Sequence, residues 1–172
     1  MTLTARGMTR FIMSIEQAVQ LVVDSAHLAQ GGEVFVTKMP VIRIQDLAEV
    51  MIQELAPKYG KVPGEINIEI VGSKPGEKQY EELMTLEEVR RAVDLPRYFA
   101  VRPAFSSLYG EIDYLYPEVV HGEVEKPYHS GNEEALDKEA LRQFLYENAL
   151  LEGEPEETFQ PDRRYWGDEK AR

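Results

Sequence analysis

The sequence predicts a mixed α/β fold with short strands and about four helices, and two kinds of local pattern support this prediction. Residues 66–71 alternate apolar and polar side chains, with three isoleucines on one face, which is typical of a strand. Ser14 and Thr85 each stand three residues before a Gln or a Glu, the spacing of a capping box that opens a helix. The 172 residues are enough for one domain with a core.

The first helix begins after Ser14, and Gly31 and Gly32 end it. Its apolar residues cover more than one stripe, so we expect this helix to be covered on more than one side. Ile15, Ala18, Val19, Val22 and Ala26 are expected on one face of this helix, and Leu21 and Val23 widen its apolar surface. The next elements are expected to be strands over 33–37 and 41–44, a helix over 46–59, the strand over 66–71, a helix from Thr85 to about residue 94, and a strand over 98–102.

The first 104 residues are expected to form a domain, and three further segments follow it. Residues 105–132 are rich in Tyr, Gly and Glu without a steady period, so we expect an irregular extension. Residues 133–151 have the apolar spacing of a helix. Residues 152–172 are charged and contain prolines, so this tail is expected to be either disordered or an arm laid on a partner.

Composition excludes several classes of function. A net charge of −12 argues against general affinity for nucleic acid or anionic lipid, although a small anionic ligand remains compatible if a few cations gather locally. The absence of cysteine excludes disulfides, thiolate metal sites and cysteine nucleophiles. No apolar run is long enough to span a bilayer, and the first seven residues do not read as a secretory signal. We therefore expect a soluble cytoplasmic protein.

Searches for a catalytic or metal centre find no candidate. No glycine-rich dinucleotide or phosphate-loop fingerprint follows a predicted strand. No Tyr is followed four residues later by Lys, the acid and base pair of short-chain dehydrogenases. His27, His121 and His129 lack ligand-type spacing with each other or with nearby carboxylates, so they are interpreted as ordinary surface or core residues. The sequence thus predicts neither a catalytic residue nor a metal site.

The stretch 72–81 is the part of the chain that most suggests a ligand. Its Pro-Gly turn is stiff, and Lys74 and Glu77 could offer a cation to a phosphate and a carboxylate to paired sugar hydroxyls. The alternative is an ordinary solvated Pro-Gly turn. Arg10 lies just before the first helix and is a candidate anion clamp. The alternative for Arg10 is a residue that covers the helix entrance or pairs with an acidic neighbour.

Four blocks in this order resemble the C-terminal, substrate-binding part of the polysaccharide-biosynthesis branch of extended short-chain dehydrogenases, typified by UDP-N-acetylglucosamine 4,6-dehydratases. The blocks are MTRFIMS at 8–14 with EQA at 16–18, GGEVFV at 31–36 with KMP at 38–40, IQDLA at 44–48, and GSKPGEK at 72–78 with Glu81. The likeness covers roughly residues 2–102. It implies that residues 1–104 form a small nucleotide-sugar-binding domain.

The resemblance also implies roles for single residues. In that family the loop usually reads Arg-Pro-Gly-Glu-Lys, where the Arg holds the nucleotide diphosphate and the Glu holds the ribose. This implies that Lys74 and Glu77 bind a UDP-sugar here, and Arg10 matches the family's other diphosphate-contacting arginine. Lys74 lacks the planar fork of Arg, which implies altered phosphate recognition. Tyr80 stands where relatives often carry His.

The family's Rossmann half binds NAD or NADP and carries the catalytic residues, and it would precede Met8. We therefore expect no cofactor and no dehydratase activity in this chain alone. The first helix normally packs against that half, so the resemblance implies either self-association or a separately encoded Rossmann partner. The alternative function is a non-enzymatic interaction or regulatory module that keeps the fold, with its acidic C-terminal extension doing the binding.

Overall fold

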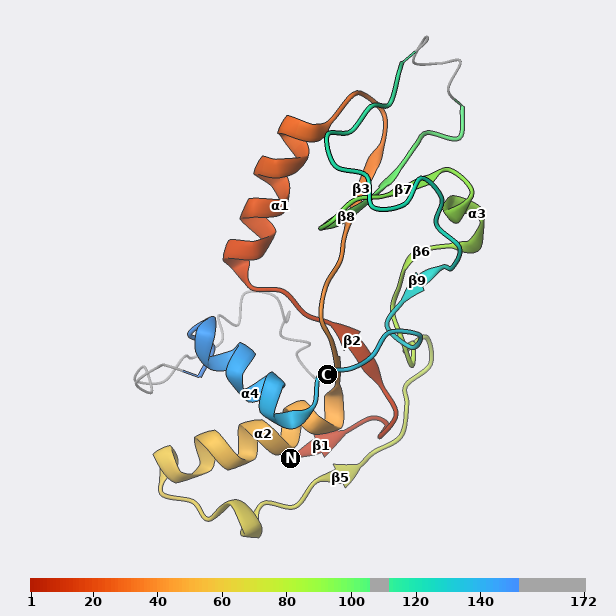
Figure 1. The fold of residues 1–172 in the computed structure, drawn as a ribbon. Coiled ribbons are helices and arrows are strands. Elements are labelled where there is room, and N and C mark those ends of the chain that lie inside the picture. Colours follow the sequence, from red (N-terminus) through yellow and green to blue (C-terminus); the bar gives the residue numbers. More distant parts are fainter. Residues whose placement is uncertain (106–111, 152–172) are drawn as a thin grey trace, which may run out of the picture.

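The computed structural model describes residues 1–105 and 112–151, which form the mixed α/β fold that the sequence predicts (Figure 1). The helices are α1 (Ile15–Leu28), α2 (Ile44–Leu55), α3 (Leu86–Val89) and α4 (Lys138–Glu147), with short 3-10 turns at Ala56–Tyr59 and Pro63–Glu65. The strands are β1 (Thr2–Leu3), β2 (Thr9–Phe11), β3 (Val34–Thr37), β4 (Val41–Arg43), β5 (Glu69–Ile70), β6 (Glu82–Met84), β7 (Ala92–Asp94), β8 (Tyr98–Val101) and β9 (Tyr128–His129).

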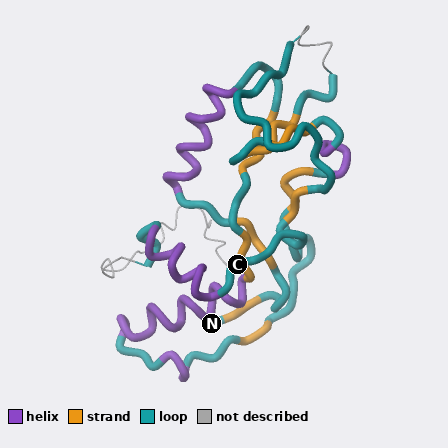
Figure 2. Tube along the Cα trace, viewed as in Figure 1, coloured by secondary structure: helices purple, strands orange, loops and turns teal. Residues whose placement is uncertain are grey.

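The strands form small sheets that are joined by long loops (Figure 2). A three-stranded antiparallel sheet, in the order β3-β8-β7, lies beside α1 at one end of the molecule (Figure 1). The antiparallel pair β2–β4 sits nearer the other end, where α2 and α4 pack together. The pairs β1–β5 (parallel) and β6–β9 (antiparallel) complete the arrangement. Consequently the middle of the molecule is built from short strands and the loops between them.

Three hydrophobic clusters hold the described residues together, and each includes residues from beyond position 104. The first cluster joins β4 and α2 to α4 through Ile42, Val50, Leu141, Leu145 and Leu151. The second contains Met84, Val89, Ala92, Val101 and Tyr128. The third contains Val93, Leu95, Tyr98, Ala100 and Tyr116. Packing therefore crosses the boundary that the sequence suggests at residue 104.

Several predicted elements are confirmed with shifted bounds. Both capping boxes form, because the Ser14 and Thr85 side chains accept from the amides of Gln17 and Glu88. The helix expected over 46–59 begins earlier, at Ile44, and its last turn becomes the 3-10 turn that contains Pro57. The helix expected over 133–151 is the shorter α4. The strands expected over 33–37, 41–44 and 98–102 are β3, β4 and β8.

Two predictions of local structure are wrong. The helix from Thr85 stops at Val89, and Ala92–Asp94 is instead strand β7, because these residues pair with β8 and bury two apolar side chains there. The strand over 66–71 shrinks to Glu69–Ile70 because its partner β1 is also two residues long, and Ile70 stays 40% exposed. The tail at 152–172 and part of the extension, 106–111, lie outside the described residues.

The apolar face of α1 is exposed, so the described residues do not supply the cover that the sequence predicts for this helix. No residue of α1 is buried, and Ile15, Val19 and Val22 are 79%, 59% and 69% exposed. The helix contacts the rest of the described chain through its opposite side, where Leu21 and Leu28 pack against the third cluster. Figure 1 shows α1 running along one flank with no described segment on its outer side. None of the described helices is long and apolar enough to cross a membrane.

Candidate functional site

Strand β2 and the loop at 72–81 meet through Arg10. Arg10 lies opposite the buried Ile42 of β4, and its side chain is 22% exposed. Its Nη2 donates to the carbonyl oxygen of Lys78 at 2.8 Å, and its Nη1 donates to that of Gln79 at 3.4 Å. Nη1 also donates to the carbonyl of Thr9 at 2.7 Å. The candidate anion clamp is therefore in direct contact with the loop that carries the other two candidates.

Arg10 also forms the acidic pairing that was its alternative role. Its Nε lies 3.7 Å from a carboxylate oxygen of Glu81, whose other oxygen accepts from the amide of Phe11 at 3.4 Å. An Arg can hold several acceptors at once because its planar guanidinium carries five donors. The guanidinium thus ties β2 to the end of the loop while it remains partly exposed. This arrangement is compatible with a further anionic partner.

Glu77 is held inside the loop by two hydrogen bonds. One oxygen accepts from the amide of Lys74 at 3.1 Å, and the other accepts from the hydroxyl of Thr4 at 3.0 Å. The backbone turn closes with the amide of Glu77 donating to the carbonyl of Lys74 at 3.1 Å. Gly76 adopts a φ of 85°, which a residue with a Cβ rarely takes. The Pro-Gly turn therefore presents Lys74 and Glu77 in a defined arrangement.

These contacts act on the acidity of Glu77. The Lys74 amide lowers the pKa of Glu77 most, the Thr4 hydroxyl lowers it next, and the charges of Arg10 and Lys74 add to the effect. The structure thus brings the three residues predicted from the sequence, Arg10, Lys74 and Glu77, into one neighbourhood. Their role in binding stays a prediction. Thr4 was missed, and no local pattern could have found it because it lies 73 residues from Glu77.

Glu77 is expected to titrate below its ordinary pKa of 4.5. A carboxylate with a lowered folded pKa stabilises the fold above its unfolded pKa, and this contribution is lost as the pH falls through the folded pKa. NMR measures the midpoint of this titration from the chemical shift of the Glu77 carboxyl carbon. The pH is varied between about 2 and 7, the range in which carboxyl groups ordinarily titrate. A midpoint at or above 4.5 would contradict the hydrogen bonds described here.

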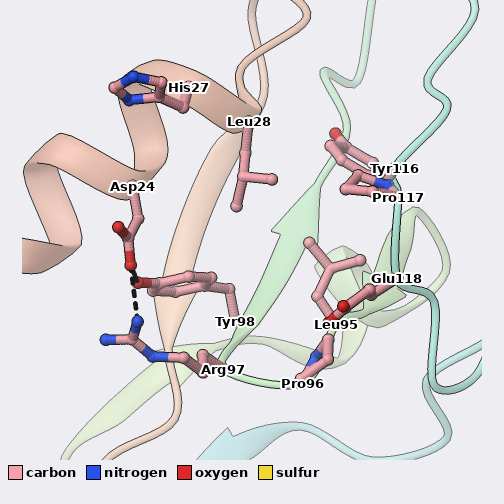
Figure 3. Close-up of a pocket in the computed structure, with 10 residues that line it drawn as sticks. All are labelled: Asp24, His27, Leu28, Leu95, Pro96, Arg97, Tyr98, Tyr116, Pro117 and Glu118. Carbon is pink, nitrogen blue, oxygen red and sulfur yellow. Dashed lines mark hydrogen bonds and ion pairs between the residues drawn. The ribbon is translucent and has the colours of Figure 1, made fainter.

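A separate pocket of 270 Å³ lies between the C-terminal half of α1, the turn from β7 to β8 and residues 116–118 (Figure 3). Asp24 accepts hydrogen bonds of 2.7 Å from both the Tyr98 hydroxyl and the Arg97 guanidinium at its edge. Burial and the bond to Asp24 raise the pKa of Tyr98 to about 12, while the Tyr98 bond lowers the pKa of Asp24. The residues that line this pocket do not include Arg10, Lys74 or Glu77, so the pocket is distinct from the predicted site.

A smaller cavity of 140 Å³ lies between the segments 12–17 and 37–40, which belong to the first two of the four sequence blocks. It is lined by Ile12, Met13, Gln17, Thr37, Lys38, Met39, Pro40 and Arg97. Lys38 pairs with Asp94 and lies 4.9 Å from the ring centre of Phe99, so its charge is already engaged. The sequence block that contains Arg10 therefore also lines a cavity at the N-terminal end of α1.

The described residues do not fit a nicotinamide dinucleotide. A dinucleotide fold places a glycine-rich turn between a parallel strand and a helix. Within 1–105 and 112–151 the only parallel strand pair is β1–β5, with two residues in each strand, and neither strand leads directly into a helix. No group of three or more His, Asp or Glu side chains in these ranges could hold a metal ion.

The chain is similar in sequence to a protein family and to several known proteins. A family model described as "Polysaccharide biosynthesis protein" matches residues 1–103. A protein of Methanocaldococcus jannaschii, named as an uncharacterized membrane protein, is 45% identical over 150 residues, or 87% of this chain and 41% of that protein. The UDP-glucose 4-epimerase of Rickettsia bellii is 34% identical over 101 residues, or 59% of this chain and 28% of that protein.

A solved structure supports the fold. The X-ray structure of Pen from Bacillus thuringiensis matches with a TM-score of 0.74 and 38% identity, over 88% of this chain and 42% of that one. This chain therefore spans less than half the length of these relatives. Because the name of the archaeal relative refers to a membrane, the cytoplasmic location expected from the sequence stays a prediction.

Proposed function

This chain belongs to the polysaccharide biosynthesis protein family, and we propose on that basis that it supplies the nucleotide-sugar-binding part of a sugar-nucleotide dehydratase or epimerase. The observation that carries this proposal is the contact between Arg10 and the loop at 72–81. It gathers two cations and a carboxylate that is kept ionised, the chemistry that suits a diphosphate next to a ribose. A relative named as a UDP-glucose 4-epimerase points to UDP as the nucleotide.

In this proposal each candidate residue has one task. Arg10 and Lys74 bind the diphosphate, while Glu77 accepts hydrogen bonds from the ribose hydroxyls. The sugar would extend toward the 140 Å³ cavity, whose lining includes Ile12, two residues after Arg10. Lys74 is exposed, and as a point charge it provides less geometric selection than an Arg would. Arg10 is therefore the residue that would orient the diphosphate.

Calorimetric titration of the full chain with UDP and with UDP-N-acetylglucosamine tests the proposal. We expect both to bind, and we expect Lys74→Ala to weaken UDP binding roughly tenfold, as for the loss of one charge-assisted contact. Lys78→Ala removes the same charge from the same loop and is the matched control, with an affinity close to that of the unmodified chain. A dissociation constant of about 1 mM is taken as the upper limit for specific binding. If UDP at that concentration releases no heat, the alternative function, a non-enzymatic interaction module, is favoured.

A complete dehydratase or epimerase of this kind also needs NAD or NADP, and we propose that a cofactor-binding part outside these 172 residues provides it. The relatives are more than twice as long as their matched region, which leaves room for such a part. The exposed apolar strip on α1, formed by Ile15, Val19, Val22 and Val23, is the surface it would cover. The chain by itself would then show no dehydratase activity with UDP-N-acetylglucosamine and NADP.

Without that part, the strip on α1 is expected to drive self-association. Size-exclusion chromatography with light scattering should give a mass above the 19.7 kDa of one chain. The double change Val19→Lys and Val22→Lys should shift the chain toward 19.7 kDa, because it places charges in the strip. Leu86→Lys places one such charge on an apolar residue of α3 that is 63% exposed and lies outside the strip, so it should leave the mass unchanged. A monomer of the unmodified chain at high concentration would contradict this proposal.

A further inference from the structure

Ser130 lies immediately after β9 and is completely buried. Its hydroxyl accepts from the amide of Glu81 at 2.9 Å and lies 2.9 Å from the hydroxyl of Thr9. The same hydroxyl donates to the carbonyl oxygen of Thr9 at 3.2 Å. The amide of Ser130 donates to the carbonyl of Glu81 at 2.8 Å. Because a hydroxyl offers one donor and two acceptor positions, these three contacts use its full capacity.

Both residues held by Ser130 are direct partners of Arg10. Thr9 precedes Arg10 in β2, and its carbonyl also accepts from Nη1 of Arg10 at 2.7 Å. Glu81 ends the loop and forms the ion pair with Nε of Arg10. The amide of Thr9 donates to Gln79 in the same loop at 3.0 Å. Ser130 therefore joins the strand that carries the guanidinium to the end of the loop that the guanidinium contacts.

The neighbours of Ser130 pack closely on the same loop. The rings of His129 and Tyr80 stack with their centres 4.8 Å apart. A Cβ on Gly131 would lie 3.3 Å from both of these side chains, so only a very small residue fits there without displacing them. Tyr80 thus contacts the extension at 105–132, while 47% of this residue stays exposed. The segment 129–131 forms a clamp on the loop, and we use this name for it below.

The clamp lies beyond the region shared by the family. The family model ends at residue 103, and the match to the Rickettsia bellii epimerase spans 101 residues. The match to the archaeal relative spans 150 residues and must therefore continue well past residue 103. We infer that Ser130 is a positioning residue for the nucleotide site. In proteins that carry this extension, it holds Arg10 and the loop in the arrangement that binds the diphosphate.

The inference rests on the proposed function and deepens it. A loop that is already ordered before the ligand arrives loses less conformational entropy on binding, which increases affinity. Without the Ser130 hydroxyl, the Glu81 amide would lose an acceptor and the Thr9 hydroxyl would lose its partner. The end of the loop would then open more often, and Arg10 would lose its fixed position beside Glu81.

Ser130→Ala in the full chain tests the inference with two measurements. Hydrogen exchange at the Glu81 amide should become about ten times faster, the change expected when one hydrogen bond of about 1.4 kcal/mol is lost. The affinity for UDP in calorimetry should fall by roughly the same factor. Ser130→Cys keeps nearly the same volume but bonds weakly, so it should change both quantities in the same direction even if the Ala variant folds poorly.

Asp137→Ala is the stability control. Asp137 also lies beyond residue 104 and caps α4 by accepting from the amide of Ala140 at 2.8 Å, and it makes no hydrogen bond to the loop among those described. This variant should lower the unfolding midpoint without changing UDP affinity. Equal losses of affinity in Asp137→Ala and Ser130→Ala at equal stability would overturn the inference. An unchanged Glu81 exchange rate in both Ser130 variants would also overturn it. If the unmodified chain does not bind UDP, the proposed function fails, and the exchange rates alone still decide whether Ser130 positions the loop.

Discussion

Arg10→Ala is expected to abolish measurable UDP binding, with a loss of affinity of about a hundredfold or more. The change removes the partly exposed guanidinium that would hold the diphosphate. It also removes the hydrogen bonds to the carbonyls of Lys78 and Gln79, which tie the loop to β2. Glu81 would be left without its cationic partner beside the site and would repel an anionic ligand. The two losses act in the same direction, so this effect should exceed that of any single change in the loop at 72–81.

Two further variants separate the contributions of Arg10. Arg10→Lys keeps the charge but not the planar fork, so UDP affinity should be intermediate between that of the unmodified chain and that of Arg10→Ala. Arg43→Ala removes an arginine of the neighbouring strand that lies opposite Thr9 and pairs with Asp46 at 3.3 Å. Because the Arg43 side chain is 54% exposed and points to a different partner, this control should bind UDP normally. An Arg10→Ala affinity within twofold of the unmodified chain (about 0.4 kcal/mol) would refute the proposed site.

Leu141→Ala is expected to lower the free energy of unfolding by about 3 kcal/mol, within the range measured for buried Leu to Ala changes. Leu141 is fully buried and joins α4 to Ile42 and Val50 in the first cluster. Urea denaturation followed by circular dichroism measures the change. A single transition is expected, because residues beyond 104 contribute to all three clusters.

The control for this prediction is Leu150→Ala. Leu150 lies close along the chain but is 53% exposed, so its replacement should change the free energy of unfolding by less than about 0.5 kcal/mol. A loss below about 1 kcal/mol for Leu141→Ala would contradict the packing of α4 on α2. Two separate transitions, one of which involves only α4, would show that α4 folds independently of residues 1–104.

Short sequence patterns predict part of the candidate site. The Pro-Gly loop and the cation before the first helix are visible as short patterns, and the structure places Arg10, Lys74 and Glu77 in one neighbourhood. The extension, by contrast, shows no steady period, so nothing in it marked Ser130 as a partner of the loop. Its contact with Thr9 spans 121 residues, and only the folded chain brings the two hydroxyls together.

The sequence by itself determined the features that depend on neighbours three or four residues apart. Both capping boxes, the start of α1 and the stiff turn between Lys74 and Glu77 are of this kind, because each of their hydrogen bonds closes within one turn of the chain. The tertiary structure decided which elements would meet. It made Ala92–Asp94 a strand because β8 was available to pair with it, and it left the apolar side of α1 without a partner among the described residues. Such outcomes depend on the packing of segments far apart in the chain, which no local pattern encodes.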